Sequence, residues 1–197
     1  MRRRRRSSGL SFYEKESKIK LRFVKELLVW LLYTAVAVLM AVVVVEAFGY
    51  RASVIGASME PGLTNGQNVL VDRVVYRISS ISRGDVIVFY PGGNEATHPY
   101  IKRVVAGPGD TVQIVDGELL VNGFPDPGNE EYDKMEDAGI AADVVTLGDG
   151  EYFVLGDNRN NSEDSRSAGI GAVTESAVIG KAWLSLPSGE QGLGVVH

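Results

Sequence analysis

The chain has 197 residues, of which 45% are hydrophobic and 23% charged, enough for a membrane segment and one compact domain of roughly 150 residues. It has no cysteine, which excludes disulfide bonds and thiolate metal sites. The net charge of -5 divides unevenly: residues 1–26 hold ten Lys/Arg and three Glu (+7), and residues 46–197 hold ten Lys/Arg and twenty-two Asp/Glu (-12).

The first element is an apolar run of nineteen residues without a charge, 27–45. A helix of about 20 apolar residues crosses the hydrocarbon core of a bilayer, so we predict a transmembrane anchor at 27–46. Ten basic residues precede it, which predicts that the tail 1–26 lies in the cytoplasm and the chain beyond the anchor lies outside. The alternative is a cleavable signal peptide with small residues at Ala47 and Gly49. The run exceeds the roughly 7 to 15 apolar residues of such peptides, which favours a retained anchor.

The basic tail contains five consecutive arginines, Arg2 to Arg6. We expect this run to orient the anchor and to contact anionic lipid headgroups. A role in nucleic-acid binding is the weaker alternative, because no aromatic residues are interleaved with the arginines.

After residue 46 the pattern changes to short alternating runs separated by Gly, Pro, Asn and Asp, which is typical of β-strands. Seven short strands joined by tight turns predict a mainly β, antiparallel domain over residues 47–190, followed by a C-terminal tail at 191–197. Within it an acidic, turn-rich stretch at about 117–150 is interpreted as a small inserted subdomain with a solvated charged face. The predicted strands are 69–75, 85–90, 100–105, 111–115, 118–121, 152–155 and 178–186.

A single hydroxyl stands out in the loop that follows the anchor, at Ser58. Gly56 allows a close backbone approach, and Pro61 and Gly62 favour a turn. A serine alone is a weak nucleophile and needs a base, so this loop is either an ordinary turn or one half of a catalytic pair.

The strand at 100–105 offers a base, Lys102. Alternation places Lys102 on the same face as Tyr100 and Val104, among apolar groups. Burial there would lower the pKa of the amine, and a decrease of about 3 pH units from about 10.4 would let it act near neutral pH. The alternative is an edge-strand lysine whose amine reaches water.

A third segment, 156–166, combines several Asp and Asn residues with two arginines, which indicates a rigid hydrogen-bonded loop. Asp157 or Asp164 could pair with Arg159 or Arg166, and Ser162 could hydrogen-bond a neighbouring lysine. A plain surface turn or a loose calcium loop remain the alternatives.

Taken together, four ordered blocks resemble bacterial type I signal peptidase, and the resemblance covers roughly residues 27–186. Each block is moderately specific, and the ordered set behind an N-terminal anchor is highly specific. The blocks are Ser-Met-Glu-Pro at 58–61, Arg-Gly-Asp-Val at 83–86, Tyr-Ile-Lys-Arg at 100–103 with Pro-Gly-Asp at 108–110, and Gly-Asp-Asn-Arg-Asn-Asn-Ser-Glu-Asp-Ser-Arg at 156–166.

The resemblance implies a serine protease on a largely β fold, with a Ser/Lys dyad in place of Ser-His-Asp. Ser58 matches the nucleophile, Lys102 the general base and Ser162 the serine that orients the lysine. The remaining matches are residues that support the loop (Asp157, Arg159, Asp164 and Arg166), residues that line the substrate pockets (Val54, Leu63, Tyr100 and Ile101), and the oxyanion positions Ser58 and Gly56. Some members of the family carry a serine at the place of Gly56, so the second oxyanion donor here would be a backbone N–H or a water.

The implied activity is endoproteolytic removal of signal peptides from exported preproteins, by cleavage after a small residue at an Ala-x-Ala type site. The implied surroundings are the plasma membrane, with the catalytic domain outside the cell, signal peptides and the lipid bilayer as partners and the protein-export machinery nearby. We expect no nucleic-acid partner, no cofactor and no metal.

Other interpretations compete with this one. His98 could replace Lys102 as the base, since related eukaryotic and archaeal enzymes use histidine, but it stands in a predicted turn. A self-cleaving Ser/Lys repressor-type protease would carry a DNA-binding module and no anchor. A membrane-tethered β module that binds a partner through residues 122–150 would leave Ser58 unreactive.

For Trp183 we expect a place in the core or, as an alternative, at the lipid interface.

Overall fold

A computed structural model describes residues 12–74, 76–188 and 192–196, so the arginine run at 2–6 and His197 lie outside the described residues. The chain divides into two compact units with a boundary between Val44 and Val45, and each unit is described by itself.

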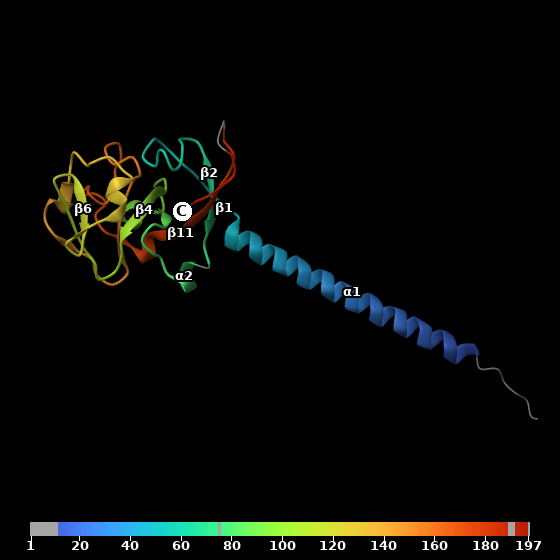
Figure 1. The fold of residues 1–197 in the computed structure, drawn as a ribbon. Coiled ribbons are helices and arrows are strands. Elements are labelled where there is room, and N and C mark those ends of the chain that lie inside the picture. The colour runs from blue at the N-terminus through green and yellow to red at the C-terminus, as the bar shows by residue number, and fades with distance from the viewer. Residues whose placement is uncertain (1–11, 75, 189–191, 197) are drawn as a thin grey trace, which may run out of the picture. The chain divides into compact units, whose positions relative to one another are not determined.

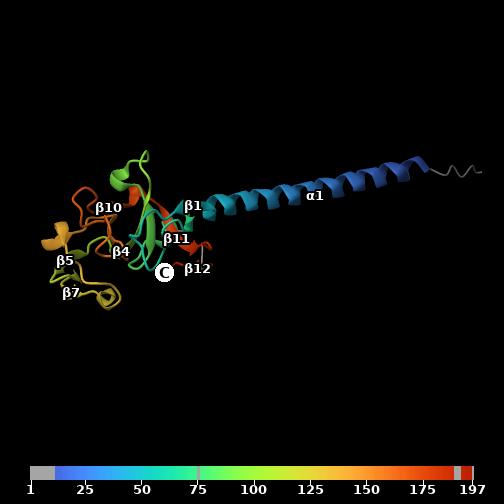
Figure 2. The ribbon, with the colours of Figure 1, turned by 90° about the horizontal axis from the view of Figure 1, so that it is seen from above.

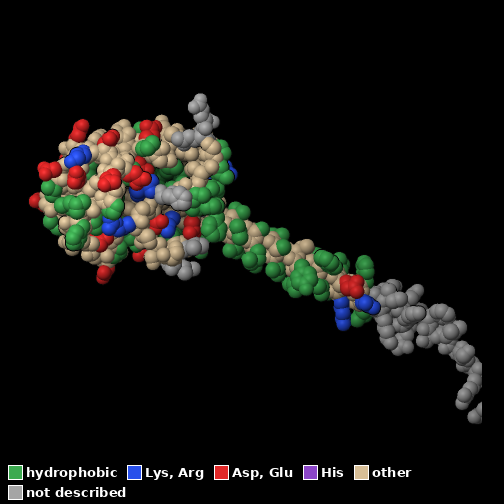
Figure 3. Space-filling view, in the orientation of Figure 1, with side chains coloured by type: hydrophobic (Ala, Val, Ile, Leu, Met, Phe, Trp, Pro, Cys, Tyr) green, Lys and Arg blue, Asp and Glu red, His purple; other side chains and the backbone are tan. Residues whose placement is uncertain are grey.

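The helix α1 spans Phe12–Phe48 and contains no glycine or proline, which explains its 37-residue length. The helix ends at Phe48, and the next residue is Gly49, a type that is unfavourable within helices. Its segment Leu21–Phe48 is mostly apolar, is exposed to solvent over residues 21–46, and is long enough to cross a membrane by length and composition. At 1.5 Å per residue its 28 residues extend over about 42 Å. The predicted anchor at 27–46 lies within this segment, and its apolar side chains form the apolar stretch along the helix in Figure 3.

The second unit is built from two antiparallel sheets, which confirms the predicted mainly β fold. The larger sheet has the strand order β1-β2-β11-β3-β4-β9-β10, with β12 paired to β11, and the smaller sheet has the order β7-β6-β5-β8. In both views the smaller sheet lies at one end of this unit and β1 at the other (Figures 1 and 2).

The larger sheet consists of β1 (Tyr50–Ser53), β2 (Asn68–Asp72), β3 (Val86–Phe89), β4 (Tyr100–Ala106), β9 (Glu151–Leu155), β10 (Val173–Thr174), β11 (Val178–Ser185) and β12 (Gly194–Val195). The smaller sheet consists of β5 (Thr111–Val115), β6 (Glu118–Val121), β7 (Phe124–Pro125) and β8 (Val145–Thr146). The remaining elements are α2 (Tyr76–Ser79) and four short 3₁₀ turns, Pro91–Gly93, Pro127–Glu130, Gly139–Ala142 and Glu175–Ala177.

All seven predicted strands are present; those at 111–115 and 118–121 have the predicted bounds, and the other five have shifted ends. The largest shift concerns the strand predicted at 69–75, because β2 ends at Asp72, whose carboxylate accepts a hydrogen bond from the Val74 N–H (2.9 Å) and turns the chain. Residue 75 lies outside the described residues. Of the strands that the pattern did not predict, β1 has four residues, and β7, β8, β10 and β12 have only two residues each, too few to show alternation.

The smaller sheet spans Thr111 to Thr146 because β5 pairs with both β6 and β8. It therefore includes β5, which precedes the start of the predicted subdomain at about residue 117. Figure 3 shows acidic side chains distributed over the visible face of the β unit, as its charge of -12 leads one to expect.

The core lies on both faces of the larger sheet, and β3 is buried at all four positions. The neighbouring strand β4 pairs with β3 in a register that sets Lys102 opposite Ile87. Trp183 on β11 is 39% exposed and packs edge-to-face against Phe48, with ring centroids 6.1 Å apart. It is therefore neither a fully buried core residue nor a free surface side chain.

Candidate active site

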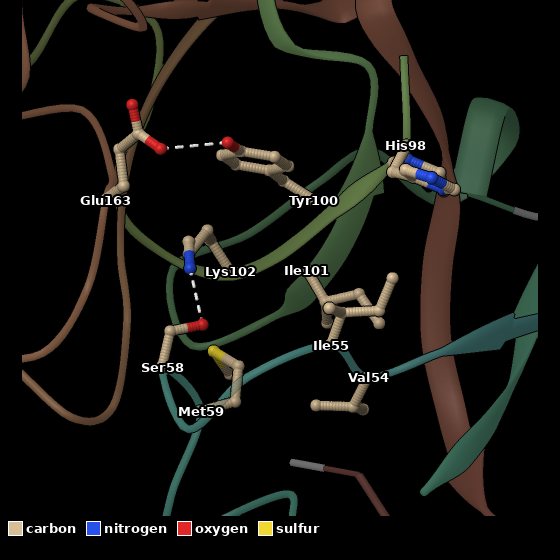
Figure 4. A pocket seen from close by; sticks show the side chains of 10 residues that line it. Val54, Ile55, Ser58, Met59, His98, Tyr100, Ile101, Lys102 and Glu163 are labelled. Carbon is tan, nitrogen blue, oxygen red and sulfur yellow. Dashed lines mark hydrogen bonds between the residues drawn. The ribbon is translucent and has the colours of Figure 1, made fainter. Parts of the chain in front are cut away.

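The two residues singled out as nucleophile and base meet in the structure. The Nζ atom of Lys102 lies 2.6 Å from the Oγ atom of Ser58, although 44 positions separate them in the chain. Ser58 comes from the loop between β1 and β2, and Lys102 from β4 (Figure 4). This distance permits direct proton transfer between the hydroxyl and the amine.

Lys102 is held in a buried position, with 4% of its surface exposed. Burial lowers the pKa of its amine from 10.5 to about 8, because the protonated form loses hydration. The nearby Asp164, Glu163 and Asp157 oppose this effect, and Arg166 adds to it. The side chain also lies over the ring of Tyr100, with Nζ 5.6 Å from the ring centroid.

The loop around Ser58 is fixed by backbone hydrogen bonds. The Leu63 N–H donates to the Met59 carbonyl (2.7 Å), the Gly66 N–H donates to the Val54 carbonyl (2.8 Å), and Met59 is fully buried. The Ser58 carbonyl accepts a hydrogen bond from the Asn158 N–H (3.1 Å), which ties the nucleophile's backbone to the loop at 156–166. Ser58 is therefore fixed both by hydrogen bonds within its own loop and by the loop at 156–166.

Gly156 makes this approach possible. A Cβ atom at this position would lie 2.4 Å from the Ser58 carbonyl oxygen and 2.3 Å from Ser162 Oγ, well inside contact distance. Any larger residue would force the two loops apart.

Within the loop at 156–166, a buried ion pair joins Asp164 and Arg166. The Arg166 Nε and Nη2 atoms donate to the two carboxylate oxygens at 2.9 and 3.0 Å, and the Gly156 N–H donates to the same carboxylate at 3.1 Å. Arg166 also donates to the carbonyls of Asp137 and Arg159. Because one guanidinium binds two positions of the loop and a residue outside it, Asp137, it stabilises the loop as a unit.

Asp157 pairs with a residue that the sequence did not point to. Its carboxylate accepts two hydrogen bonds from Arg103, at 2.7 and 2.8 Å, instead of pairing with Arg159 or Arg166. Arg159 is buried, has no carboxylate within 4 Å among the described residues, and stacks on the ring of Tyr132 at 4.2 Å. The Arg103 pair fastens the loop directly to β4, next to Lys102.

Ser162 and Gly56 do not make the interactions that were expected of them. The Ser162 Oγ atom is buried beside Gly156 and has no hydrogen-bond partner among the described residues, so the expected bond to Lys102 is not formed. The Gly56 N–H donates to Asn65 Oδ1 (3.0 Å), which removes it as an oxyanion donor. Gly56 has a φ of +81°, a conformation that glycine adopts without strain.

A cavity of about 270 Å³ opens beside the Ser58–Lys102 pair (Figure 4). Val54, Tyr100 and Ile101 line it as expected, whereas Leu63 is buried in the core and does not. The position next to Ser58 could have indicated Met59 as a further lining residue, whereas nothing in the pattern indicated Glu163. These further residues are Ile55, Met59, His98, Pro99 and Glu163.

Comparisons with known proteins identify the family to which the chain belongs. The sequence profile of the family described as "Signal peptidase, peptidase S26" matches residues 27–186. The chain is 33% identical to signal peptidase I T of Bacillus subtilis over 153 residues, covering 74% of this chain and 77% of that protein. It is 31% identical to signal peptidase IB of Staphylococcus aureus over 174 residues, covering 80% and 87%.

Among solved structures, a signal peptidase I from Enterococcus faecalis is 31% identical, with a TM-score of 0.39 and coverage of 52% of this chain and 96% of that chain.

Proposed function

Since the chain belongs to the signal peptidase family, peptidase S26, and is a serine peptidase, we propose that it removes signal peptides through a Ser58/Lys102 dyad. Cleavage would follow a small residue at an Ala-x-Ala type site of an exported preprotein. The observation that carries this proposal is the 2.6 Å contact between the Ser58 hydroxyl and the buried amine of Lys102.

In the proposed reaction the neutral amine of Lys102 takes the Ser58 proton as Oγ attacks the scissile carbonyl. The protonated amine then donates that proton to the leaving amino group, which leaves an acyl-enzyme on Ser58. Lys102, neutral again, takes a proton from the water that releases the signal peptide, and Ser58 Oγ recovers a proton as its ester bond breaks. The Ser58 N–H, which has no acceptor among the described residues, is available to bind the oxyanion.

The proposed binding of an apolar side chain rests on the cavity beside the dyad, which has a volume of about 270 Å³. Its apolar residues Val54, Met59 and Ile101 suit apolar side chains such as alanine. Burial of those side chains would also exclude water from Lys102 and keep its pKa low.

We further propose that residues 27–46 cross the plasma membrane, that 1–26 form a basic cytoplasmic tail and that 47–190 form the catalytic domain outside the cell. The apolar segment Leu21–Phe48 supports a span, and the basic residues that precede it support the orientation. Such an anchor would tether the catalytic domain to the membrane that a signal peptide crosses.

Cleavage of purified precursors tests the function. The full chain in detergent should cut a precursor with an Ala-x-Ala site after the -1 alanine, as shown by N-terminal sequencing of the product. A matched precursor with leucine at -1 should be cut at least about tenfold more slowly if the enzyme requires a small residue at that position. Ser58→Ala protein should leave both precursors intact. Cleavage at other positions, or equal cleavage of the two precursors, would refute the proposed specificity.

A further inference from the structure

Glu163 occupies a place that the proposed reaction does not explain. It is exposed, follows Ser162 in the loop at 156–166 and lines the cavity beside the dyad. Its Oε2 atom accepts a hydrogen bond from the Tyr100 hydroxyl at 2.9 Å, which fixes the carboxylate at the rim (Figure 4). A carboxylate in this position faces whatever enters the cavity.

The charge of Glu163 has no counter-ion within the described residues. The other two carboxylates of the loop are neutralised by arginines, Asp164 by Arg166 and Asp157 by Arg103. No lysine or arginine of the described residues lies within 4 Å of Glu163.

The catalytic lysine does not neutralise Glu163 either. Lys102 directs its amine toward Ser58 and must be uncharged to act as a base. His98, a further titratable residue beside the cavity, is well separated from Glu163 on the opposite side (Figure 4). In the active form of the dyad, this side of the cavity therefore carries one net negative charge.

We propose that Glu163 is a specificity-determining residue that favours a lysine or arginine side chain of the substrate close to the scissile bond. This inference rests on the proposed function. The free Oε1 atom and the unneutralised charge suit a cationic side chain, which can form a charge-assisted hydrogen bond while Oε2 keeps its bond to Tyr100. The apolar segment of a signal peptide and its small -1 and -3 residues leave the positions -2, +1 and +2 for such a side chain.

The expected effect is moderate because Glu163 is exposed. Attraction of a lysine and repulsion of a glutamate at one position should together change kcat/KM about tenfold. Salt should reduce this ratio, because exposed charges are screened.

Peptides with one Ala-x-Ala site and with Lys, Ala or Glu at -2, +1 or +2 test the proposal. The readout is the ratio of kcat/KM for the Lys and Glu peptides within each enzyme, so a general loss of activity cancels. The wild-type chain should prefer Lys about tenfold at one or more of these positions. Glu163→Gln, which keeps a hydrogen-bond acceptor for Tyr100, should bring the ratio close to one, and Glu163→Lys should invert it.

Glu175→Gln is the matched control, because it removes the same charge from an exposed position outside the cavity and should leave the ratio unchanged. If the wild type cleaves all peptides with equal kcat/KM, or if Glu163→Gln keeps the preference, the role of Glu163 is refuted and the proposed function stands. If the wild type cleaves none of the peptides, the proposed function fails and this inference fails with it.

Discussion

The pH dependence of cleavage should follow the protonation of Lys102. Only the neutral amine can accept the Ser58 proton, and burial lowers its pKa to about 8. About half of the enzyme would then carry a neutral lysine at pH 8, about one molecule in ten at pH 7 and about one in a hundred at pH 6. A lysine with the ordinary pKa of 10.5 would be neutral in only about one molecule in three hundred at pH 8.

The assay is kcat/KM for a precursor or peptide without titratable groups near its cleavage site, from pH 5.5 to 10, since this parameter reports the free enzyme. It should rise about tenfold per pH unit up to a midpoint near 8 and then level off. Glu163→Gln should move the midpoint to lower pH, because the charge of Glu163 favours the protonated amine. Asp164 and Asp157 act in the same direction and Arg166 in the opposite one, and these three stay unchanged in that variant.

The result that would refute this reasoning is a midpoint near 6.5, which is the usual pKa of a histidine and would indicate His98 as the base. A rate that stays constant down to pH 5.5 would refute it equally. Circular dichroism at each pH verifies that the chain is folded throughout.

Two further predictions concern stability and geometry. The folded pKa of Lys102 lies below its unfolded value of 10.5, so the protonated amine destabilises the fold by roughly 3 kcal/mol below about pH 8, and this penalty disappears above about 10.5. Lys102→Met should therefore raise the free energy of unfolding at pH 6 by about 1–3 kcal/mol in urea titrations while it abolishes cleavage. A lower free energy of unfolding in this variant would contradict the predicted penalty for burying the protonated amine. Gly156→Ala should lower kcat about a hundredfold, since its Cβ would lie 2.4 Å from the Ser58 carbonyl oxygen. Gly107→Ala, whose Cβ would meet its nearest atoms at 3.9 Å, is the control and should keep kcat within about twofold; equal effects of both changes would refute the steric argument.

Local patterns in the sequence were sufficient to predict the strands that carry the site. Alternation along 100–105 predicts an inward Lys102, and the structure buries it on β4. The apolar run at 27–45 similarly predicts a long helix, because nothing in it interrupts helical hydrogen bonding.

Contacts between distant segments were not predictable in the same way. Asp157 pairs with Arg103 because β4 and the loop at 156–166 meet in three dimensions, and no local pattern distinguishes Arg103 from the nearer Arg159. The bond from the Gly56 N–H to Asn65 is likewise a property of the folded loop, as is the burial of Leu63 away from the cavity. Resemblance transfers residue types, whereas hydrogen-bond partners depend on the packing of this chain.

Glu163 is a second example of a residue whose place in the site could not be predicted from the sequence. In the sequence it is one of twenty-five acidic residues, with nothing to set it apart. Its hydrogen bond to Tyr100 and its place beside the cavity become visible only when β4 and the loop are brought together.

The measurement that tests the Ser58/Lys102 dyad most directly compares kcat/KM of the wild type with Ser58→Ala, Lys102→Met and His98→Ala on one Ala-x-Ala precursor. The first two changes should each lower kcat/KM at least about a thousandfold in a folded protein, and His98→Ala should keep it within about threefold. Full activity of Lys102→Met, or loss of activity in His98→Ala alone, would contradict the dyad and assign the base to another residue.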